Sequence, residues 1–261
     1  MQSALWVSKT GLAAQDTALR TISNNLANVS TVGFKRDRAV FQDLMYQIDQ
    51  QPGGMTSQDT TNPSGLQLGV GVRVAGTQKE FTEGALQTTG QSLDLAIEGR
   101  GFFQITMPDG TLGYSRSGTF QLDQDGRIVT AQGFPVEPAI NVPADANEIT
   151  IGVDGTVSVT IPGSATPSQL GNLQLVSFMN PAGLEAVGSN LYRETAASGT
   201  PQQGTPGENG LGQVVQGALE TSNVSVVEEL VNMVATQRAY EMNSRVISSA
   251  DQMLQFLTQN V

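Results

Sequence analysis

Two heptad series of apolar residues, one at each end of the chain, constrain the fold more than any other feature. Near the N-terminus, leucines recur every seven residues, with further apolar residues three positions later. On an α-helix this spacing forms one apolar seam that is stable only when it is buried against another helix. A helix over residues 3–29 would be about 40 Å long. The residues expected in this seam are Leu5, Leu12, Leu19, Ile22, Leu26 and Val29.

A second heptad series occupies the C-terminal end. Its expected members are Met233, Tyr240, Val246, Ile247, Met253, Leu254 and Leu257. Two heptad arms with the rest of the chain between them favour one coiled-coil unit built from both termini. Two amphipathic helices that cover an ordinary core would give the same pattern, because heptads this short also occur in soluble bundles.

The composition between the two ends favours β structure. Of the 261 residues, 38% are hydrophobic and only 5% aromatic, while 29 glycines supply many turns. Such a chain is long enough to bury a core and to hold one or two domains. It is more typical of a β-rich body with many turns than of a dense enzyme core.

The chain contains neither cysteine nor histidine. This excludes Cys–His catalysis, a Ser-His-Asp triad and an ordinary zinc site. We therefore expect no catalytic residue, no cofactor, no metal and no enzymatic activity. Acidic pairs such as Glu80 and Glu83 could act as acid and base only within a cleft, so a glycosidase is the weakest alternative.

Charge is distributed unevenly around a net charge of −11. Residues 1–40 carry five basic and two acidic groups, whereas residues 224–261 carry two basic and four acidic groups. Opposite signs on the two arms favour their pairing, and an acidic body argues against a nucleic-acid partner. The mixed cluster Lys35-Arg36-Asp37-Arg38 is expected to be a solvated face or an ion-pair site between subunits.

No membrane span is expected, because no stretch approaches 18 consecutive apolar residues. The first residues also lack the basic region and apolar core of a cleavable signal peptide. If the protein leaves the cytoplasm, we expect another export signal.

Turn signals outline the middle of the chain. A weak helical period over residues 40–45 gives way to a polar stretch over 49–65, which predicts an extended hairpin or a projecting loop. From Leu66 to Val74 apolar residues alternate with polar residues and glycines, as in a strand with one buried face. Residues 195–212 are expected to form a linker or a long loop, and Thr221-Ser222-Asn223 to cap the last helix.

Aspartate–glycine pairs between apolar runs predict β-hairpin turns at Asp109-Gly110, Asp125-Gly126 and Asp154-Gly155. The stretch from Asp123 to Gly126 resembles the start of a calcium loop, but the later ligands are missing, so a hairpin turn is the better interpretation.

We predict an α+β fold in which the N- and C-terminal helices pair as a coiled-coil unit. An extended hairpin or loop segment and an all-β central domain complete it. The expected domains are residues 1–30 with 224–261 (coiled coil), 31–68 (extended segment) and 69–223 (β-rich).

Three motifs in order then resemble one known family. Residues 24–36 resemble the N-terminal signature of the bacterial flagellar axial proteins, which include rod, hook and hook-associated subunits. Residues 217–224, 228–231 and 237–241 are similar to the C-terminal motif of that family, and residues 95–103 to its central β motif. The motif positions singled out are Asn24, Asn25, Asn28, Thr31, Gly33, Phe34, Gln237, Arg238 and Tyr240.

Overall length and the segment 46–65 are most similar to subunits of the distal rod. The resemblance implies a structural subunit that polymerises into a rigid drive shaft and transmits motor torque through the outer rings to the hook. The stiffening segment is marked by Tyr46, Pro52, Gly53, Pro63 and Gly65.

The resemblance also implies partners and a location. The expected partners are further copies in a helical homopolymer, the proximal rod proteins, the hook protein, the P and L rings, the rod-capping protein and the flagellar type III export apparatus. The expected location is the flagellar basal body, from the periplasm to the outer membrane. A proximal rod or hook subunit is the nearest alternative, and a secreted β-rich adhesin is a more distant one.

Overall fold

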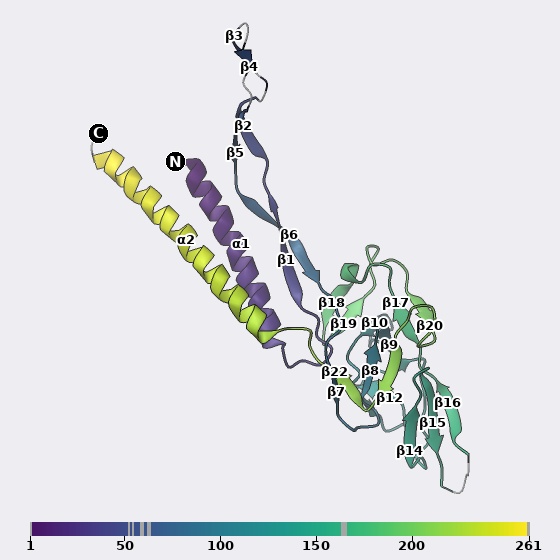
Figure 1. Cartoon of the computed structure of the whole chain (residues 1–261). Helices are drawn as coiled ribbons and strands as arrows, with labels where there is room; N and C mark the ends of the chain where they lie inside the picture. The colour runs from purple at the N-terminus through teal and green to yellow at the C-terminus, as the bar shows by residue number, and fades with distance from the viewer. Residues whose placement is uncertain are drawn as a thin grey trace. The chain divides into compact units, whose positions relative to one another are not determined.

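A computed structural model describes residues 2–51, 53, 55–57, 60–61, 64–162 and 166–259 (Figure 1). Helix α1 (Gln2–Ala27) and helix α2 (Val226–Gln259) flank a middle made of strands, which confirms the α+β class. The chain forms two compact units. The arm unit comprises Met1–Leu26, Asp37–Gln78 and Ser225–Val261, and the body unit comprises Ala27–Arg36 and Lys79–Val224. The three-domain division stays a prediction.

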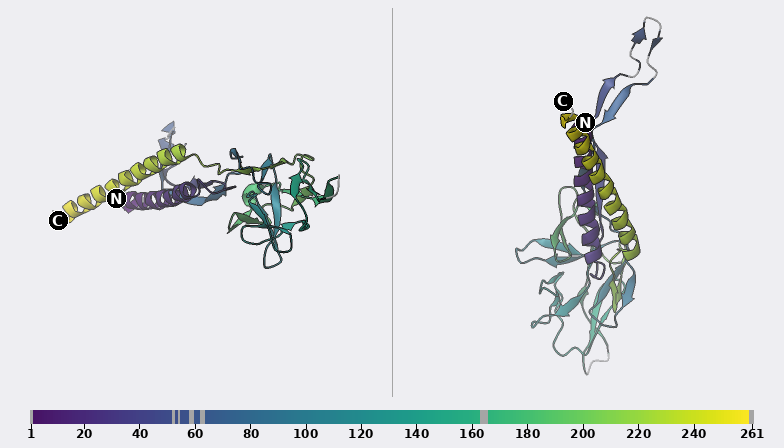
Figure 2. Two further views of the ribbon diagram at one scale, coloured as in Figure 1. Left: turned by 90° about the horizontal axis from the view of Figure 1, so that it is seen from below. Right: turned by 90° about the vertical axis from the view of Figure 1, so that its left-hand side faces the viewer.

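The two helices of the arm unit lie side by side and antiparallel (Figures 1 and 2). Helix α1 ends at Ala27, two residues before the predicted end, because the next residues form a turn in which Thr31 N–H donates to Asn28 O at 3.1 Å. Helix α2 is capped by Ser225, whose Oγ accepts from Glu228 N–H at 3.5 Å. The predicted cap at residues 221–223 is therefore wrong.

The arm unit also carries a long hairpin. Strand β1 (Asp37–Asp43) pairs with β6 (Val72–Lys79), β2 (Tyr46–Gln50) with β5 (Leu66–Gly69), and β3 (Met55–Ser57) with β4 (Thr60–Thr61). The predicted extended hairpin is confirmed, and the weak helical period over 40–45 is replaced by strand. Because every residue of β2 and β5 is exposed, the expectation of a strand with one buried face is wrong here.

The body unit is built from short strands around one main sheet. Its order is β18-β19-β10-β9-β17-β20, with β13 also paired to β9. The strands are β7 (Leu86–Thr88), β8 (Leu95–Glu98), β9 (Phe102–Thr106), β10 (Leu112–Ser115), β11 (Phe120–Leu122), β12 (Ile128–Thr130), β13 (Val136–Glu137), β14 (Glu148–Ile151), β15 (Thr156–Thr160), β16 (Ser168–Asn172), β17 (Leu175–Ser177), β18 (Glu185–Gly188), β19 (Leu191–Arg193), β20 (Gln202–Gly204), β21 (Gln213–Gln216) and β22 (Ala218–Glu220), with a 3₁₀ turn at Pro181–Gly183.

The predicted hairpins of the body are confirmed. Antiparallel pairing joins β9 with β10, β11 with β12, and β14 with β15, and the Asp-Gly pairs lie at these three turns. The segment 195–212, which was expected to be a loop, contains β20, whose residues pair with β17. The polar composition of this segment gave no sign of a strand. At a sheet edge, backbone pairing depends little on side-chain hydrophobicity, so a polar strand can form there.

Three apolar clusters are found among the described residues of the body, the smallest around Ile105, Met107 and Leu191. The largest one lies between the sheets and includes Phe103 and Phe120, whose rings meet edge to face at 5.1 Å between centroids. The second is aromatic and contains Phe102, Tyr114 and Phe178. Edge-to-face rings stabilise such a core beyond their buried area.

Candidate functional site

A buried ion cluster lies within the body unit. Lys35, Glu220 and Arg116 are 0%, 1% and 4% exposed. Lys35 Nζ lies 2.6 Å from Glu220 Oε1, and Arg116 Nε lies 3.1 Å from Glu220 Oε2. The second contact is an ion pair without hydrogen-bond geometry. One carboxylate thus faces two cations away from water, so the free energy of this cluster depends on all three charges being present.

Backbone groups complete the cluster. Lys35 Nζ also donates to Thr82 O at 2.6 Å, and Gly84 N–H donates to Glu220 Oε1 at 2.9 Å. Arg116 Nη1 donates to the carbonyl oxygens of Gly99 and Gly101 at 2.8 and 2.9 Å. Burial lowers the pKa of Lys35, and the Glu220 carboxylate opposes this shift. The cluster ties the segment 27–36 to strands far away in the sequence.

Asn223 forms a second set of contacts beside this cluster. Its Oδ1 accepts from Arg36 N–H at 2.8 Å, and its Nδ2 donates to Glu80 O at 2.8 Å. The Arg36 side chain pairs with the Glu80 carboxylate at 2.6 Å. Glu80 is therefore engaged in an ion pair.

A buried amide joins three elements of the arm unit. Asn25, 1% exposed in α1, donates from Nδ2 to Asp37 O at 2.8 Å and accepts at Oδ1 from Asp37 N–H at 2.8 Å. The same Nδ2 lies 3.3 Å from Glu229 Oε1 in α2. One side chain thus connects α1, the start of β1 and the first turn of α2.

Of the remaining N-terminal motif positions, Asn24 belongs to the arm unit and Asn28, Thr31, Gly33 and Phe34 belong to the body unit. Asn28 Oδ1 accepts from Thr31 Oγ1 at 3.2 Å. Gly33 has a φ of +70°, and a Cβ there would lie 2.7 Å from Ser117 N, so only glycine fits. Phe34 is buried under Lys79, whose Nζ lies 5.3 Å from the ring centroid. Asn24 is exposed, with Nδ2 3.5 Å from Asp37 Oδ2.

The C-terminal motif residues Gln237, Arg238 and Tyr240 lie on the exposed surface of α2. Arg238 Nη1 pairs with Glu241 at 3.0 Å. A role for these three residues between subunits stays a prediction.

The residues predicted to pack between subunits lie on the two helices and just after α1. Ile22 is buried at 9%, whereas Leu5, Leu12, Leu19, Leu26 and Val29 are half-buried. On α2, Met233 and Ile247 are half-buried and Tyr240, Val246 and Met253 are exposed. The side chains of Leu254 and Leu257 lie outside the described residues. Where α1 approaches α2, a Cβ on Gly11 would lie 3.0 Å from Asn243 Nδ2.

Of the stiffening-segment positions, Tyr46 is exposed, Gly53 is an exposed turn residue and Gly65 is half-buried. Pro52 and Pro63 lie outside the described residues. The packing of this segment between subunits stays a prediction.

The sequence did not indicate that Glu220, Arg116, Asn223 or Glu229 connects segments that are far apart in the chain. Lys35 was expected in a solvated or intersubunit cluster, and the structure instead buries it against Glu220 in the same chain. The only available signal was that Lys35 lies directly after buried Phe34, inside a motif. Its partner is 185 positions away, so no local pattern reveals the pair.

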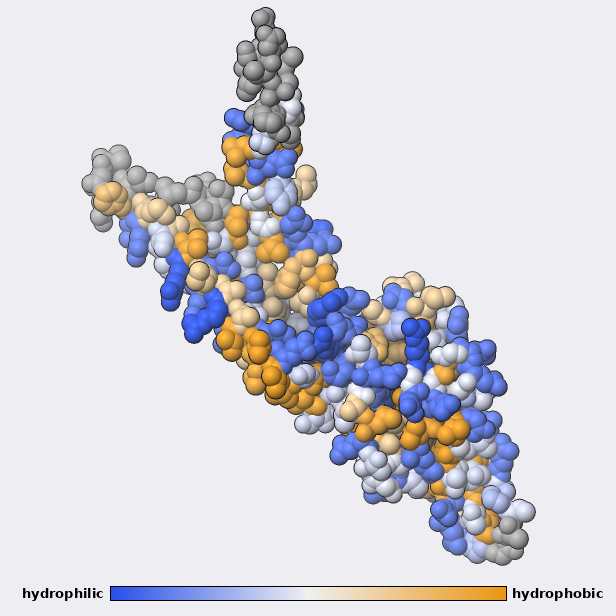
Figure 3. All heavy atoms as spheres, viewed as in Figure 1, coloured by the Kyte–Doolittle hydropathy of each residue, from blue (hydrophilic) through white to orange (hydrophobic). Residues whose placement is uncertain are grey.

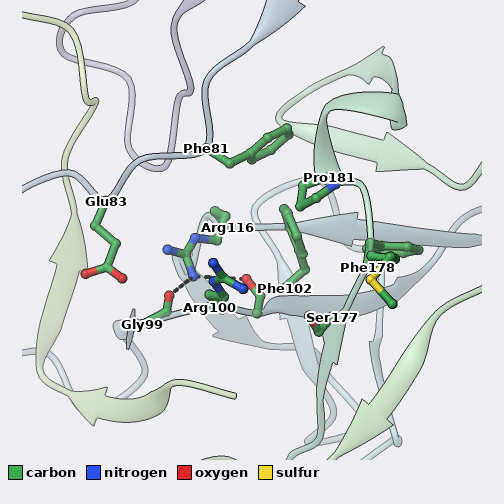
Figure 4. A pocket seen from close by; sticks show the side chains of 11 residues that line it. Phe81, Glu83, Gly99, Arg100, Phe102, Arg116, Ser177, Phe178 and Pro181 are labelled. Atoms are coloured by element: carbon green, nitrogen blue, oxygen red, sulfur yellow. Dashed lines mark hydrogen bonds between the residues drawn. The ribbon is translucent and has the colours of Figure 1, made fainter. Parts of the chain in front are cut away.

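The body unit also holds a cavity of about 250 Å³, here called the aromatic–arginine pocket (Figure 4). Phe81, Phe102 and Phe178 form its apolar walls, and Glu83, Arg100 and Arg116 supply its charges. Phe81 and Phe102 meet edge to face at 5.4 Å.

Within the described residues, no three His, Cys, Asp or Glu side chains gather in a way that could hold a metal ion. In the same part of the chain, no helix is both long and apolar enough to cross a membrane.

Comparison with known proteins assigns three segments to family models. Residues 5–35 match the model described as flagella basal body rod protein, residues 96–159 match the flagellar hook protein FlgE/F/G D1 domain, and residues 215–260 match the flagellar basal body rod FlgEFG protein C-terminal region. These segments contain Lys35, Arg116 and Glu220.

Full-length relatives agree with these matches. The chain is 57% identical to the flagellar basal-body rod protein FlgG of Buchnera aphidicola subsp. Schizaphis graminum, over 99% of this chain and 100% of the relative. It is 47% identical to FlgG of Borreliella burgdorferi, with 97% of each chain covered. It is 46% identical to FlgG of Caulobacter vibrioides, with 98% of each covered.

Proposed function

We propose that this chain, which belongs to the family of flagellar basal-body rod proteins FlgG, polymerises as a helical homopolymer into the rigid distal rod. Like the other members of this family, the chain is a structural subunit of the rod. The observation that carries the proposal is the agreement with FlgG proteins along the whole chain, helical ends included. The rod would transmit motor torque through the outer rings to the hook.

The surface of the arm unit supports polymerisation. Apolar side chains gather over the first turns of α2 (Figure 3), where Val227, Val231 and Val234 are 73%, 63% and 56% exposed. A row of this kind on one helix favours burial against another chain, at about 1.5–3 kcal/mol for each large side chain. We therefore propose that coiled-coil packing is completed between subunits.

The hairpin supports a stiffening role. Both faces of the β2–β5 ribbon are exposed, and a two-stranded ribbon alone in water is only marginally stable. Packing between neighbouring subunits would cover it and resist bending of the shaft. Deleting residues 46–65 should give a polymer with a shorter persistence length in electron micrographs, and an equally straight polymer would contradict this role.

The remaining partners and the location belong to the same proposal. The rod would contact proximal rod proteins below, the hook protein above, the P and L rings around it and the rod-capping protein at its growing end. Subunits would reach the rod through the flagellar type III export apparatus. The rod itself would lie in the flagellar basal body, from the periplasm to the outer membrane. No catalytic step is proposed for this chain.

Immunogold electron microscopy of isolated hook–basal bodies tests the assignment, with an antibody against the body unit and the rings partly removed. Label on the shaft near the outer rings is expected. Label confined to the curved hook or to the inner end would instead identify a hook or proximal rod subunit. Label on neither structure, with free protein outside the cell, would favour the adhesin.

A further inference from the structure

The aromatic–arginine pocket carries positive charge on an acidic body. The body unit contains seven basic and fifteen acidic side chains. Arg100 is the basic side chain among them that has no hydrogen bond, ion pair or ring contact with any described residue. Arg116, the second arginine of the pocket, is 4% exposed and uses Nε and Nη1 for its contacts with Glu220, Gly99 and Gly101. With Glu83 as the one acid, the lining has a net positive charge.

The walls of this pocket fit an apolar side chain. Phe81 and Phe178 both lie against Phe102, with ring centroids 5.4 and 5.9 Å away, so the aromatic surface is held in place by the core behind it (Figure 4). Met179, at the rim, is 83% exposed. A preformed apolar cavity with a few convergent charges is the usual form of a binding site. Its chemistry selects an apolar side chain next to a carboxylate.

The complementary surface lies on the hairpin of this same chain. Residues 43–49, here called the acidic hairpin segment, carry Met45, Tyr46 and Ile48, which are 87%, 53% and 56% exposed. Asp43 and Asp49 at its ends have no partner among the described residues. It thus combines exposed apolar side chains with unpaired carboxylates.

The register places the apolar residues on one face of the ribbon. Tyr46 and Ile48 lie opposite Gly69 and Gln67, and side chains alternate along a strand, so both point to the same face. Asp49 follows at the register shift between Ile48 and Gln50. Leu68 pairs with Gln47 and therefore lies on the other face.

We propose that the aromatic–arginine pocket is the receptor for the acidic hairpin segment of a second copy of this chain. Tyr46 or Ile48 fills the aromatic cavity, and Asp49 or Asp43 pairs with Arg100. Charge complementarity within one sequence identifies the second copy as the occupant, because each copy carries both the unpaired cation and the unpaired carboxylates. The inference rests on the proposed polymerisation and names the contact that would fix the hairpin.

Cysteine cross-linking tests the contact directly, since the natural chain has no cysteine. One batch carries Met179→Cys with a mass tag, and a second batch carries Ile48→Cys. Both are assembled together and oxidised mildly. A disulfide between tagged and untagged chains is expected. Leu68→Cys, on the opposite face of the same ribbon, is the matched control and should cross-link to Met179→Cys much less.

A charge swap then tests Arg100. Arg100→Glu should reduce the cross-link about tenfold, corresponding to the loss of one partly buried ion pair. Adding Asp49→Arg to the second batch should restore it. Both residues are exposed, so the body and hairpin should fold normally.

The outcomes separate this inference from the proposed function. Polymer that sediments normally but gives no Ile48–Met179 disulfide, or equal cross-linking from Leu68→Cys, would overturn the pocket as receptor and leave the rod assignment intact. A third chain carries both Met179→Cys and Ile48→Cys, and a disulfide that forms within this one chain in dilute solution would overturn the second copy as occupant. If no polymer forms under any condition, both proposals fall together.

Discussion

In the body unit, Lys35 and Glu220 are 0% and 1% exposed and pair with each other, whereas in the arm unit Val227 and Met45 are 73% and 87% exposed. The body thus buries its cations around a carboxylate of the same chain, and the arm displays apolar surface that it does not cover. A buried ion pair is retained only if its partners are fixed, and an exposed apolar row is retained only if something covers it. The ion cluster of the body is therefore complete within one chain, and we infer that the apolar surface of the arm is covered on assembly.

The largest expected effect is on assembly. Leu19→Asp should abolish incorporation into the rod, because an unpaired charge would stand in the packed seam. The body unit should remain folded, since Leu19 belongs to the arm. Immunoblots of purified basal bodies measure incorporation, and circular dichroism measures the fold. Ala13→Asp, an exposed position outside the heptad column, is the control. Normal incorporation of Leu19→Asp would contradict the seam.

The next effect is on the stability of the body. Glu220→Gln leaves Lys35 and Arg116 buried without a carboxylate, which should reduce the free energy of unfolding by about 3–5 kcal/mol. Urea denaturation followed by the β signal in circular dichroism measures this. Glu185→Gln removes an exposed pair with Arg193 and should leave the midpoint unchanged. Equal effects of the two changes would show that burial of the cluster is unimportant.

A smaller effect is expected at the joint of the arm unit. Asn25→Ala removes both contacts with the Asp37 backbone and should cost about 1–3 kcal/mol. Faster hydrogen exchange at the Asp37 amide is the measurement. Asn24→Ala, beside it on the exposed side, should change that exchange much less. Unchanged exchange in Asn25→Ala would show that the amide does not hold this joint.

The smallest effect depends on pH. Burial, assisted by the Glu194 carboxylate, raises the pKa of Tyr114 to about 12. Between the ordinary tyrosine pKa of about 10 and this value, the unfolded chain has released the proton while the folded chain keeps it. Stability should therefore fall slightly as pH rises through this window. Tyrosinate absorbance should show one late step that Tyr114→Phe removes, and loss of a step near pH 10 in this variant instead would contradict the buried environment of Tyr114.

The overall layout could be predicted because its signals are local. The heptad columns mark both helices, and Asp109-Gly110 and Asp154-Gly155 mark hairpins that the structure contains. The helix boundary near residue 225 was missed because Thr221, Ser222 and Asn223 are also good caps. Asn223 instead uses its side chain for the Arg36 and Glu80 backbones.

The contacts that connect distant segments of the chain could not be predicted, since each depends on two residues that lie far apart in the sequence. Nothing beside Lys35 signals Glu220, and nothing beside Asn25 signals Glu229, 204 positions later. For the exposed hairpin, the prediction of a strand with one buried face was wrong although the local pattern was clear. Its alternating pattern over residues 66–74 resembles a half-buried strand, but every residue of β5 and all but the two end residues of β6 are exposed.

The chain passes between its two units four times, and the carboxylate that pairs with both Lys35 and Arg116 lies late in the sequence, at position 220. A product of interrupted synthesis that stops before this position would contain two cations destined for burial and no anion to accompany them. If such a fragment folded into the body, it would bury both cations without a carboxylate, which is unfavourable in free energy even though the fragment holds most of the strands. We infer that this one late carboxylate favours folding of complete subunits over incomplete ones.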